Sequence, residues 1–378
     1  MINIFEPTLG KSELAVVEAV FNSKWIGKGK YVKDFEREFA LNLNSDPEHF
    51  VSTNSCTEAI FQSAELFNFN RDDEVLVPSI NFIAIGNAIV ARNAKLRFCD
   101  VDLHSLNVTA ELIEKHITRQ TKAIYLNHYG GVSCDMDPII ELCRKSNIII
   151  IEDAACAPYS FYKGRACGTM GDMGMWSFDA MKILSTMDGG MIYLQSDTNV
   201  DIVEESLYFG LSRKQKSGID SAVSGIANWW EIQINRPGRR SIMNNVSAAI
   251  GLSQLKKLRG FIQRRKEIYD YYKEELSKLD WITTPPVIPN DYKSSYYFFW
   301  IQLQQRDKLA LFLKENDVYT TFRYWPLHMV KYFNSKQRLF NAERIAETTL
   351  NLPLHQNLTD KDVNKVVDLI KTFGKKQL

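Results

Sequence analysis

The stretch Ile148-Ile149-Ile150-Ile151-Glu152-Asp153 decides the fold of this sequence. Four consecutive isoleucines are typical of a strand that is buried on both faces, as in a parallel sheet covered by helices. Two carboxylates follow at the carboxyl end of the strand, where ligands bind in such sheets. Because burying an unpaired charge costs several kcal/mol, one carboxylate needs a cation, either a cofactor's protonated ring nitrogen or a salt-bridge partner. An N-cap role for Asp153 is the other alternative.

Short apolar runs recur on both sides of this strand and alternate with segments of helical periodicity. The runs cover residues 74–78, 96–99, 123–126, 173–178 and 191–194, and the amphipathic segments lie near 56–68, 82–92, 110–116 and 137–146. This alternation predicts an α/β fold with a mostly parallel sheet flanked by helices.

The pattern changes after Gly251. Residues 252–279 are expected to form one long helix, followed by a strand at 296–301, helices at 307–316 and 359–373, and an apolar run near 318–325. We therefore predict a large domain over residues 1–251 and a small C-terminal α+β domain over residues 252–378. Basic residues of the long helix are expected to face solvent: Lys256, Lys257, Arg259, Arg264, Arg265 and Lys266.

The composition narrows the class of protein. The 378 residues include 46 Lys and Arg against 45 Asp and Glu, a net charge of +1, which argues against nucleic acid or a membrane surface as the main partner. The apolar runs fall far short of the roughly 18 residues that span a bilayer, and no cationic signal peptide opens the chain. Six cysteines lack metal-ligand spacing, so we expect reduced thiols in a cytoplasmic protein and no metal site.

A polar stretch, Thr53-Asn54-Ser55-Cys56-Thr57-Glu58, opens the first amphipathic segment of the predicted sheet region. Ser55 and Glu58 fit a capping box, which is a structural explanation. A helix N-terminus also leaves N–H donors unpaired and carries positive partial charge, so the stretch is equally suited to bind a phosphate. Both interpretations stay open from this stretch alone.

A lysine follows another strand end, in Trp176-Ser177-Phe178-Asp179-Ala180-Met181-Lys182, and Asp188-Gly189-Gly190 precedes the next strand. Apolar surroundings are expected to lower the pKa of Lys182 and free its amine for Schiff-base chemistry. An isolated lysine is more often a surface residue, but Lys182 stands at the same predicted sheet edge as Asp153.

Together these motifs resemble the pyridoxal-phosphate-dependent sugar aminotransferases of the DegT/StrS group, within the aspartate aminotransferase superfamily (fold type I). The resemblance covers nearly the whole chain, and its order and spacing are specific. It rests on these stretches: 23–29, Asn54–Thr57, Pro78–Phe82, Glu152–Cys156, 163–172, Ser177–Gly190, Met243–Gly251, Tyr324–His328 and Leu350–His355.

The resemblance implies roles for individual residues. Lys182 resembles the lysine that carries pyridoxal 5'-phosphate covalently, and Asp153 the carboxylate that keeps its ring nitrogen protonated. Phe82 stands where an aromatic ring stacks on the cofactor. The positions of Cys56, Thr57 and Ser177 match the phosphate contacts.

Several positions depart from the family pattern. Cys156 replaces a glutamine that often touches the ring hydroxyl, and Arg240 stands where an asparagine reaches the partner subunit's phosphate. Arg240 would still bind an anion. Four residues are candidates for substrate contact, with structural roles as the alternative: His128, Trp229, Arg239 and His328.

The resemblance implies a ping-pong aminotransferase. An amino donor, expected to be glutamate, would pass its nitrogen through the cofactor to a keto sugar, usually nucleotide-linked, to make an amino sugar for a surface polysaccharide. A homodimer with composite sites is expected. A related branch of sugar dehydratases carries histidine at the lysine position, so Lys182 favours transamination, and a non-catalytic regulatory protein is a further alternative. The sequence does not select the sugar or the carbon that is aminated.

Overall fold

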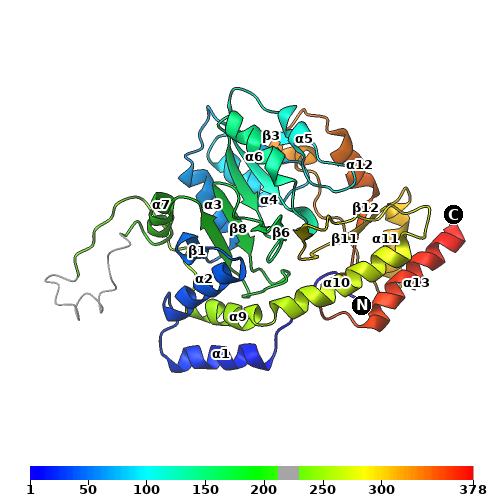
Figure 1. The fold of residues 1–378 in the computed structure, drawn as a ribbon, viewed down its shortest axis with the longest axis horizontal. Coiled ribbons are helices and arrows are strands. Elements are labelled where there is room, and N and C mark those ends of the chain that lie inside the picture. Colours follow the sequence, from blue (N-terminus) through cyan, green and yellow to red (C-terminus); the bar gives the residue numbers. More distant parts are fainter. Residues whose placement is uncertain (212–229, 378) are drawn as a thin grey trace.

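The computed structural model describes residues 1–211 and 230–377, and its centre is a seven-stranded sheet (Figure 1). The strands lie in the order β1 (Phe50–Thr53), β9 (Gly190–Leu194), β8 (Met173–Ser177), β5 (Ile149–Asp153), β4 (Thr121–Asn127), β2 (Glu74–Pro78) and β3 (Lys95–Cys99). The five strands from β8 to β3 pair in parallel, whereas β9 is antiparallel to both of its neighbours. The predicted α/β fold with a mostly parallel sheet is confirmed.

The register of the parallel strands collects their carboxyl ends at one edge of the sheet. Asp153 lies opposite Asn127 on β4 and Met175 on β8, and Ser177 ends β8 two residues later. The carboxylates of the Ile148–Asp153 stretch and the Lys182 segment therefore emerge at the same edge.

In the N-terminal part of the chain helices flank the sheet, except α1, which lies apart from it (Figure 1). Their bounds are α1 (Lys11–Asn22), α2 (Lys30–Asn42), α3 (Cys56–Leu66), α4 (Ile83–Ala91), α5 (Ala110–Glu114), α6 (Met136–Lys145) and α7 (Asp197–Leu207). Helix α3 packs against β8 and β9, which brings its N-terminus close to the loop that carries Lys182. Short strands β6 (Phe161–Tyr162), β7 (Arg165–Ala166) and β10 (Tyr292–Lys293) form a separate small sheet.

The C-terminal part corrects one prediction. The single helix expected over residues 252–279 is two helices, α9 (Asn245–Leu255) and α10 (Leu258–Leu276). Beyond them, β11 (Phe299–Gln302) pairs with β12 (Thr349–Leu352), flanked by α11 (Arg306–Glu315), α12 (Phe340–Thr348) and α13 (Asp360–Gln377). The predicted run near 318–325 forms only isolated bridges at Val318 and Thr321.

Two hydrophobic cores lie along the chain. The first surrounds the seven-stranded sheet and extends beyond residue 251 through Leu258, Phe261 and Trp300. The second contains buried residues from Ile268 to Phe373, where α10 and α13 pack together. The first core includes residues on both sides of residue 251, so the cores do not mark a domain boundary there. The division at residue 251 stays a prediction.

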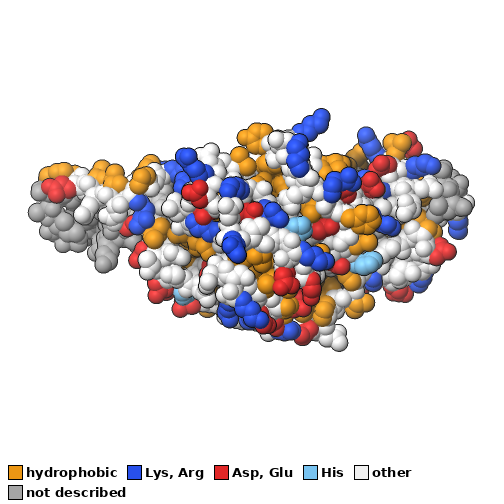
Figure 2. Space-filling model, turned by 90° about the horizontal axis from the view of Figure 1, so that it is seen from above, with side chains coloured by type: hydrophobic (Ala, Val, Ile, Leu, Met, Phe, Trp, Pro, Cys, Tyr) orange, Lys and Arg blue, Asp and Glu red, His pale blue; other side chains and the backbone are white. Residues whose placement is uncertain are grey.

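The surface mixes charges of both signs with apolar groups. Figure 2 shows Lys and Arg interspersed with Asp and Glu over the visible face. Among the described residues, no helix combines the length and the apolar character that a membrane crossing requires.

Candidate active site

Lys182 lies in the turn that joins β8 to β9. Its backbone N–H donates to Asp179 (2.9 Å), and its Nζ lies 5.0 Å from the centre of the Tyr297 ring and 3.9 Å from Cys156 Sγ. Burial acts to lower the pKa of Lys182, but the acidic groups Cys156, Tyr297, Tyr324 and Asp153 outweigh it and raise the pKa. The lowered pKa expected from the apolar sequence context is therefore wrong for the protein alone, because residues distant in sequence surround the amine.

Asp153 presents a carboxylate that the protein itself leaves partly unused. The residue is 4% exposed, and its Oδ1 accepts the Ala155 N–H (3.0 Å). The described residues supply no hydrogen bond to Oδ2 and no ion pair, and no helix begins at Asp153. Burial raises the pKa of Asp153, while the Ala155 N–H, Lys182 and His128 act to lower it. For Asp153 the salt-bridge and N-cap explanations fail, and a cationic ligand group would fit Oδ2. The salt-bridge alternative is instead realised at Glu152, whose carboxylate lies 2.9 Å from Nε2 of the buried His128.

The N-terminus of α3 offers donors beside a close turn. Ser55 Oγ caps the helix by accepting the Glu58 N–H (3.2 Å), which leaves the N–H groups of Cys56 and Thr57 without a partner among the described residues. The Glu58 carboxylate does not return to Ser55: it accepts from Gln62 (3.0 Å) and pairs with Arg239 (2.7 Å). The capping box is therefore only half formed, and the free donors suit an anion.

Gly190 keeps space open at this helix end. A Cβ there would lie 2.7 Å from Cys56 N and 2.6 Å from Thr53 Oγ1, so a side chain would fill the approach to α3. Ser177, which pairs with Gly190 across β8 and β9, is 7% exposed at the same place. The structure thus places Cys56 and Ser177 on either side of Gly190, and the roles of Cys56, Thr57 and Ser177 as phosphate contacts stay predictions.

Aromatic residues bound the site, and sequence reasoning missed two of them. Phe82, at the N-cap of α4, is 40% exposed and meets the Tyr324 ring edge-on, with 5.7 Å between centroids. The Tyr324 hydroxyl lies 3.8 Å from Cys156 Sγ, and burial raises the pKa of the Cys156 thiol. Tyr297 lies in the expected strand 296–301 and Tyr324 in the motif Tyr324–His328. Their contact with the Lys182 group could not be predicted, because it depends on the fold of the C-terminal part.

The two candidate histidines are held by protein groups. His128 is 0% exposed: its Nε2 lies 2.9 Å from Glu152, and its Nδ1 accepts the Cys134 N–H (3.2 Å). His328 Nδ1 lies 2.6 Å from Ser79 Oγ, and burial lowers the pKa of His328. His128 exposes no surface to a ligand in this conformation. The predicted substrate contacts of His128 and His328 stay predictions.

The segment before α9 contains the other predicted residues. Arg239 forms ion pairs with Glu58 (2.7 Å) and Glu65 (2.8 Å) of α3, so its charge is already neutralised in the chain. Arg240 is exposed, and no carboxylate of the described residues pairs with it. Trp229 lies outside the described residues.

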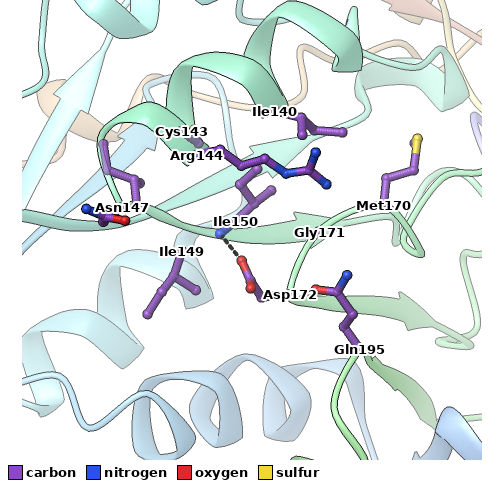
Figure 3. A pocket seen from close by; sticks show the side chains of 11 residues that line it. Ile140, Cys143, Arg144, Asn147, Ile149, Ile150, Met170, Gly171, Asp172 and Gln195 are labelled. Atoms are coloured by element: carbon purple, nitrogen blue, oxygen red, sulfur yellow. Dashed lines mark hydrogen bonds between the residues drawn. The ribbon is translucent and has the colours of Figure 1, made fainter.

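A separate pocket of about 310 Å³ opens at the amino end of β5, opposite the edge that holds Asp153 (Figure 3). Its lining includes Arg144, Asn147, Asp172 and Gln195, and Asp172 accepts the Ile150 N–H (2.8 Å). None of the predicted site residues lines this pocket.

Comparisons with known proteins agree with this geometry. The profile of the DegT/DnrJ/EryC1/StrS aminotransferase family matches residues 7–371. A dTDP-4-dehydro-2,3,6-trideoxy-D-glucose 4-aminotransferase of Saccharopolyspora spinosa is 43% identical over 97% of this chain and 95% of its own length. The spore coat polysaccharide biosynthesis protein SpsC of Bacillus subtilis is 31% identical over 98% of this chain and 96% of its own.

A crystal structure shows the same fold at full length. The aminotransferase TlmJ of Streptoalloteichus hindustanus superimposes with a TM-score of 0.94 at 44% identity, covering 100% of both chains. The resemblance inferred from the sequence motifs is confirmed. The chain belongs to the DegT/DnrJ/EryC1/StrS aminotransferase family and is a pyridoxal-phosphate-dependent sugar aminotransferase.

Proposed function

We propose that this enzyme moves an amino group from glutamate to the keto group of a nucleotide-linked sugar, in the cytoplasm, to make an amino sugar for a surface polysaccharide. The observation that carries the proposal is that one edge of the sheet holds both the Lys182 amine and the buried Asp153 carboxylate, with which no cationic side chain of the described residues forms an ion pair. The 43% identical relative, named for a 4-keto sugar nucleotide, supports that substrate class. Trp229 and Arg239 stay predictions for contact with the acceptor.

The residues present fit pyridoxal phosphate. Asp153 Oδ2 could accept from a cationic ring nitrogen, and the N–H groups of Cys56 and Thr57 could donate to a phosphate. Phe82 is partly exposed beside Tyr324 and could stack on the cofactor ring. When bound, the cofactor supplies an aldehyde that accepts the amino group and a ring that withdraws electrons from the substrate carbon.

Each residue then has a separate task. Lys182 Nζ anchors the cofactor and, once released, removes and returns a proton at the donor and acceptor carbons. The Asp153 carboxylate holds a proton on the ring nitrogen. The α3 N–H groups and the Ser177 hydroxyl bind the phosphate and fix the cofactor's orientation. Cys156 faces Lys182, with 3.9 Å between Sγ and Nζ, and burial raises the pKa of its thiol.

A dehydratase and a non-catalytic protein are the alternatives. The dehydratase branch uses histidine where this chain has Lys182, which disfavours it. A non-catalytic protein would lack the cofactor's visible absorbance. The test is to purify the protein, add amino acids until the visible band bleaches, and screen keto sugars for its recovery.

Lys182→Ala provides the matched variant. We expect it to lose turnover while keeping its fold, measured by circular dichroism and by the loss of the covalently bound visible band. Normal transamination by Lys182→Ala would contradict the assignment of the amine.

A homodimer with composite sites completes the proposal. Its support is the exposed, unpaired Arg240 and the exposed apolar side chains close to it in sequence, Ile232 (73%) and Ile234 (62%). Arg240 is assigned to an anion in the partner's site, either the cofactor phosphate or a substrate group.

Mixing a Lys182→Ala subunit with an Arg240→Ala subunit tests this assignment. Each mixed dimer would contain one site with both defects and one intact site, so activity should partly return over either mutant homodimer. Full activity and cofactor affinity in the Arg240→Ala homodimer would show that Arg240 is only a surface residue.

A further inference from the structure

Arg323 lies beside the segment that carries Lys182, on a firmly held backbone. Its N–H donates to Asn351 Oδ1 (2.8 Å), and its carbonyl accepts the Tyr129 hydroxyl. Tyr129 is in turn contacted by the Asn351 amide (3.4 Å). The position from which the Arg323 side chain starts is therefore fixed by Tyr129, in the turn after β4, and by Asn351 of β12.

The Arg323 guanidinium is directed toward the lysine segment. Nη2 lies 3.6 Å from Met181 Sδ, and Met181 is the residue before Lys182. The guanidinium also lies over the ring of Phe5, 5.1 Å from its centroid. Phe5 stacks on Tyr297 (5.5 Å, 19° between planes), and Tyr297 receives Lys182 Nζ on its ring. The stacked rings of Phe5 and Tyr297 therefore lie between the Arg323 guanidinium and the Lys182 amine.

The N-terminal segment that carries Phe5 is attached to the C-terminal part. Ile2 N–H donates to Asp317 (2.7 Å), Tyr319 N–H donates to Ile2 (2.9 Å), and Leu354 N–H donates to Ile4 (3.4 Å). Because these bonds fix the backbone before Phe5, its ring is a rigid support for the guanidinium rather than a loose surface group.

Within the part of the chain that the structure describes, the charge of Arg323 has no carboxylate counterion. No carboxylate among residues 1–211 and 230–377 forms an ion pair with it, and its neighbours are a thioether and an aromatic face. The charge reaches into the site, since Arg323 is among the groups that lower the pKa of Cys156 against the raising effect of burial. A planar fork of free donors beside the site matches the geometry of a carboxylate.

We propose that Arg323, supported by Phe5, binds the α-carboxylate of the amino donor. The inference rests on the proposed aminotransferase function and adds the residues that recognise the donor. In every α-amino acid the carboxylate and the amine share one carbon, so an amine that reaches the Lys182 position brings its carboxylate close to the Met181 neighbourhood. Arg323 is a binding residue, and Phe5 is a positioning residue.

The experiment measures donor binding apart from turnover. The holoenzyme is titrated with 2-methyl-L-glutamate, which lacks the hydrogen that must leave, and the dissociation constant is read from the absorbance change of the cofactor. We expect Arg323→Gln to raise this constant about tenfold or more, Arg323→Lys to raise it less, and Phe5→Leu to raise it while leaving the affinity for pyridoxal phosphate unchanged. Arg71→Gln, an exposed arginine before β2, is the control and should match the wild type.

Donor amides identify which carboxylate is bound. With the wild type, the rate of cofactor bleaching should fall strongly from glutamate to isoglutamine, whose α-carboxylate is an amide, and Arg323→Gln should abolish that preference. Glutamine keeps the α-carboxylate. In Arg323→Gln, the rate of cofactor bleaching with glutamine should therefore fall by as much as the rate with glutamate. An effect on glutamate alone would assign Arg323 to the side-chain carboxylate and overturn the proposal.

Two further outcomes separate this inference from the proposed function. If the wild type bleaches with amino acids but Arg323→Gln binds 2-methyl-L-glutamate equally well, or is impaired only with the keto sugar nucleotide, the Arg323 assignment is wrong. If no amino acid changes the wild-type spectrum, the aminotransferase function fails and this inference fails with it.

Discussion

Glu13 allows a quantitative prediction about how the N-terminal segment is anchored. This side chain is 5% exposed on α1. Its two oxygens accept hydrogen bonds from Gly10 N (2.8 Å), Ser253 Oγ (2.8 Å), Gln254 Nε2 (3.0 Å) and Lys257 Nζ (2.7 and 2.8 Å). Burial acts to raise the pKa of Glu13, but Lys257 and the other donors outweigh it and lower the pKa from 4.5 to about 2.

The lowered pKa of Glu13 determines how much this side chain contributes to the free energy of unfolding and over which pH range the contribution is lost. One pKa unit corresponds to about 1.4 kcal/mol, so the folded-state pKa of Glu13 contributes about 3 kcal/mol to the free energy of unfolding at pH 7. Because the folded pKa lies below the unfolded one, this stability is complete above the unfolded value. It is lost as pH falls through the folded value, and about 2 kcal/mol remains at pH 3.5.

Glu13→Gln should therefore lower the free energy of unfolding by about 3 kcal/mol at pH 7, and the deficit should narrow by about 1 kcal/mol at pH 3.5. Urea unfolding followed by tryptophan fluorescence measures both values. Glu18→Gln, exposed on the same helix, is the control and should stay within about 0.5 kcal/mol of the wild type. A deficit that is absent at pH 7, or identical at the two pH values, would refute the reasoning.

Two further predictions concern the sheet edge. Asp153→Asn should keep the cofactor bound but slow the bleaching of its visible band by about a hundredfold or more, because a neutral amide does not hold the ring nitrogen protonated; an unchanged rate would remove Asp153 from that role. Glu152→Gln should lower the free energy of unfolding by about 3 kcal/mol, because its carboxylate accepts from His128 Nε2 and from the N–H groups of Gly168, Met170 and Gly171. Thermal unfolding of the two proteins measures this difference, and equal midpoints would contradict it.

The sheet could be predicted because its strands are buried on both faces and read as unbroken apolar runs. The predicted strand at 74–78 has the bounds of β2, and the edge that carries Asp153 follows from the parallel register. The strand expected from Ile148 begins one residue later, at Ile149. Asn147 adopts a φ of +54° in the turn after α6, a conformation that asparagine tolerates.

Helix boundaries set by contacts between distant segments could not be predicted. Leu252, Leu255, Leu258 and Ile262 keep helical spacing across the break between α9 and α10, so the apolar pattern continues where the helix ends. Lys257 stands at the break, and its side chain reaches Glu13 on α1.

The burial of Arg265 could not be predicted from the sequence either. It was expected to face solvent, but it is 1% exposed and donates to the carbonyls of Leu354 (2.9 Å) and Tyr296 (3.2 Å). A basic residue in a basic helix carries no local sign that backbone carbonyls will bury it.

The active-site residues fall into two groups: those that the sheet positions and those that contacts between distant segments position. Asp153, Ser177 and Lys182 follow directly from strands, so their positions depend on main-chain hydrogen bonds that the apolar pattern predicts. Phe5, Tyr297 and Arg323 reach the site through side-chain contacts between the N-terminal segment and the C-terminal part. Substitutions of Phe5 and Arg323 should therefore change which amino donor the enzyme prefers while the cofactor stays in place, because neither residue pairs with the strands that position Asp153 and Lys182. Tyr297 differs, because its hydroxyl donates to the Met181 carbonyl (3.3 Å) and its ring lies under Lys182 Nζ.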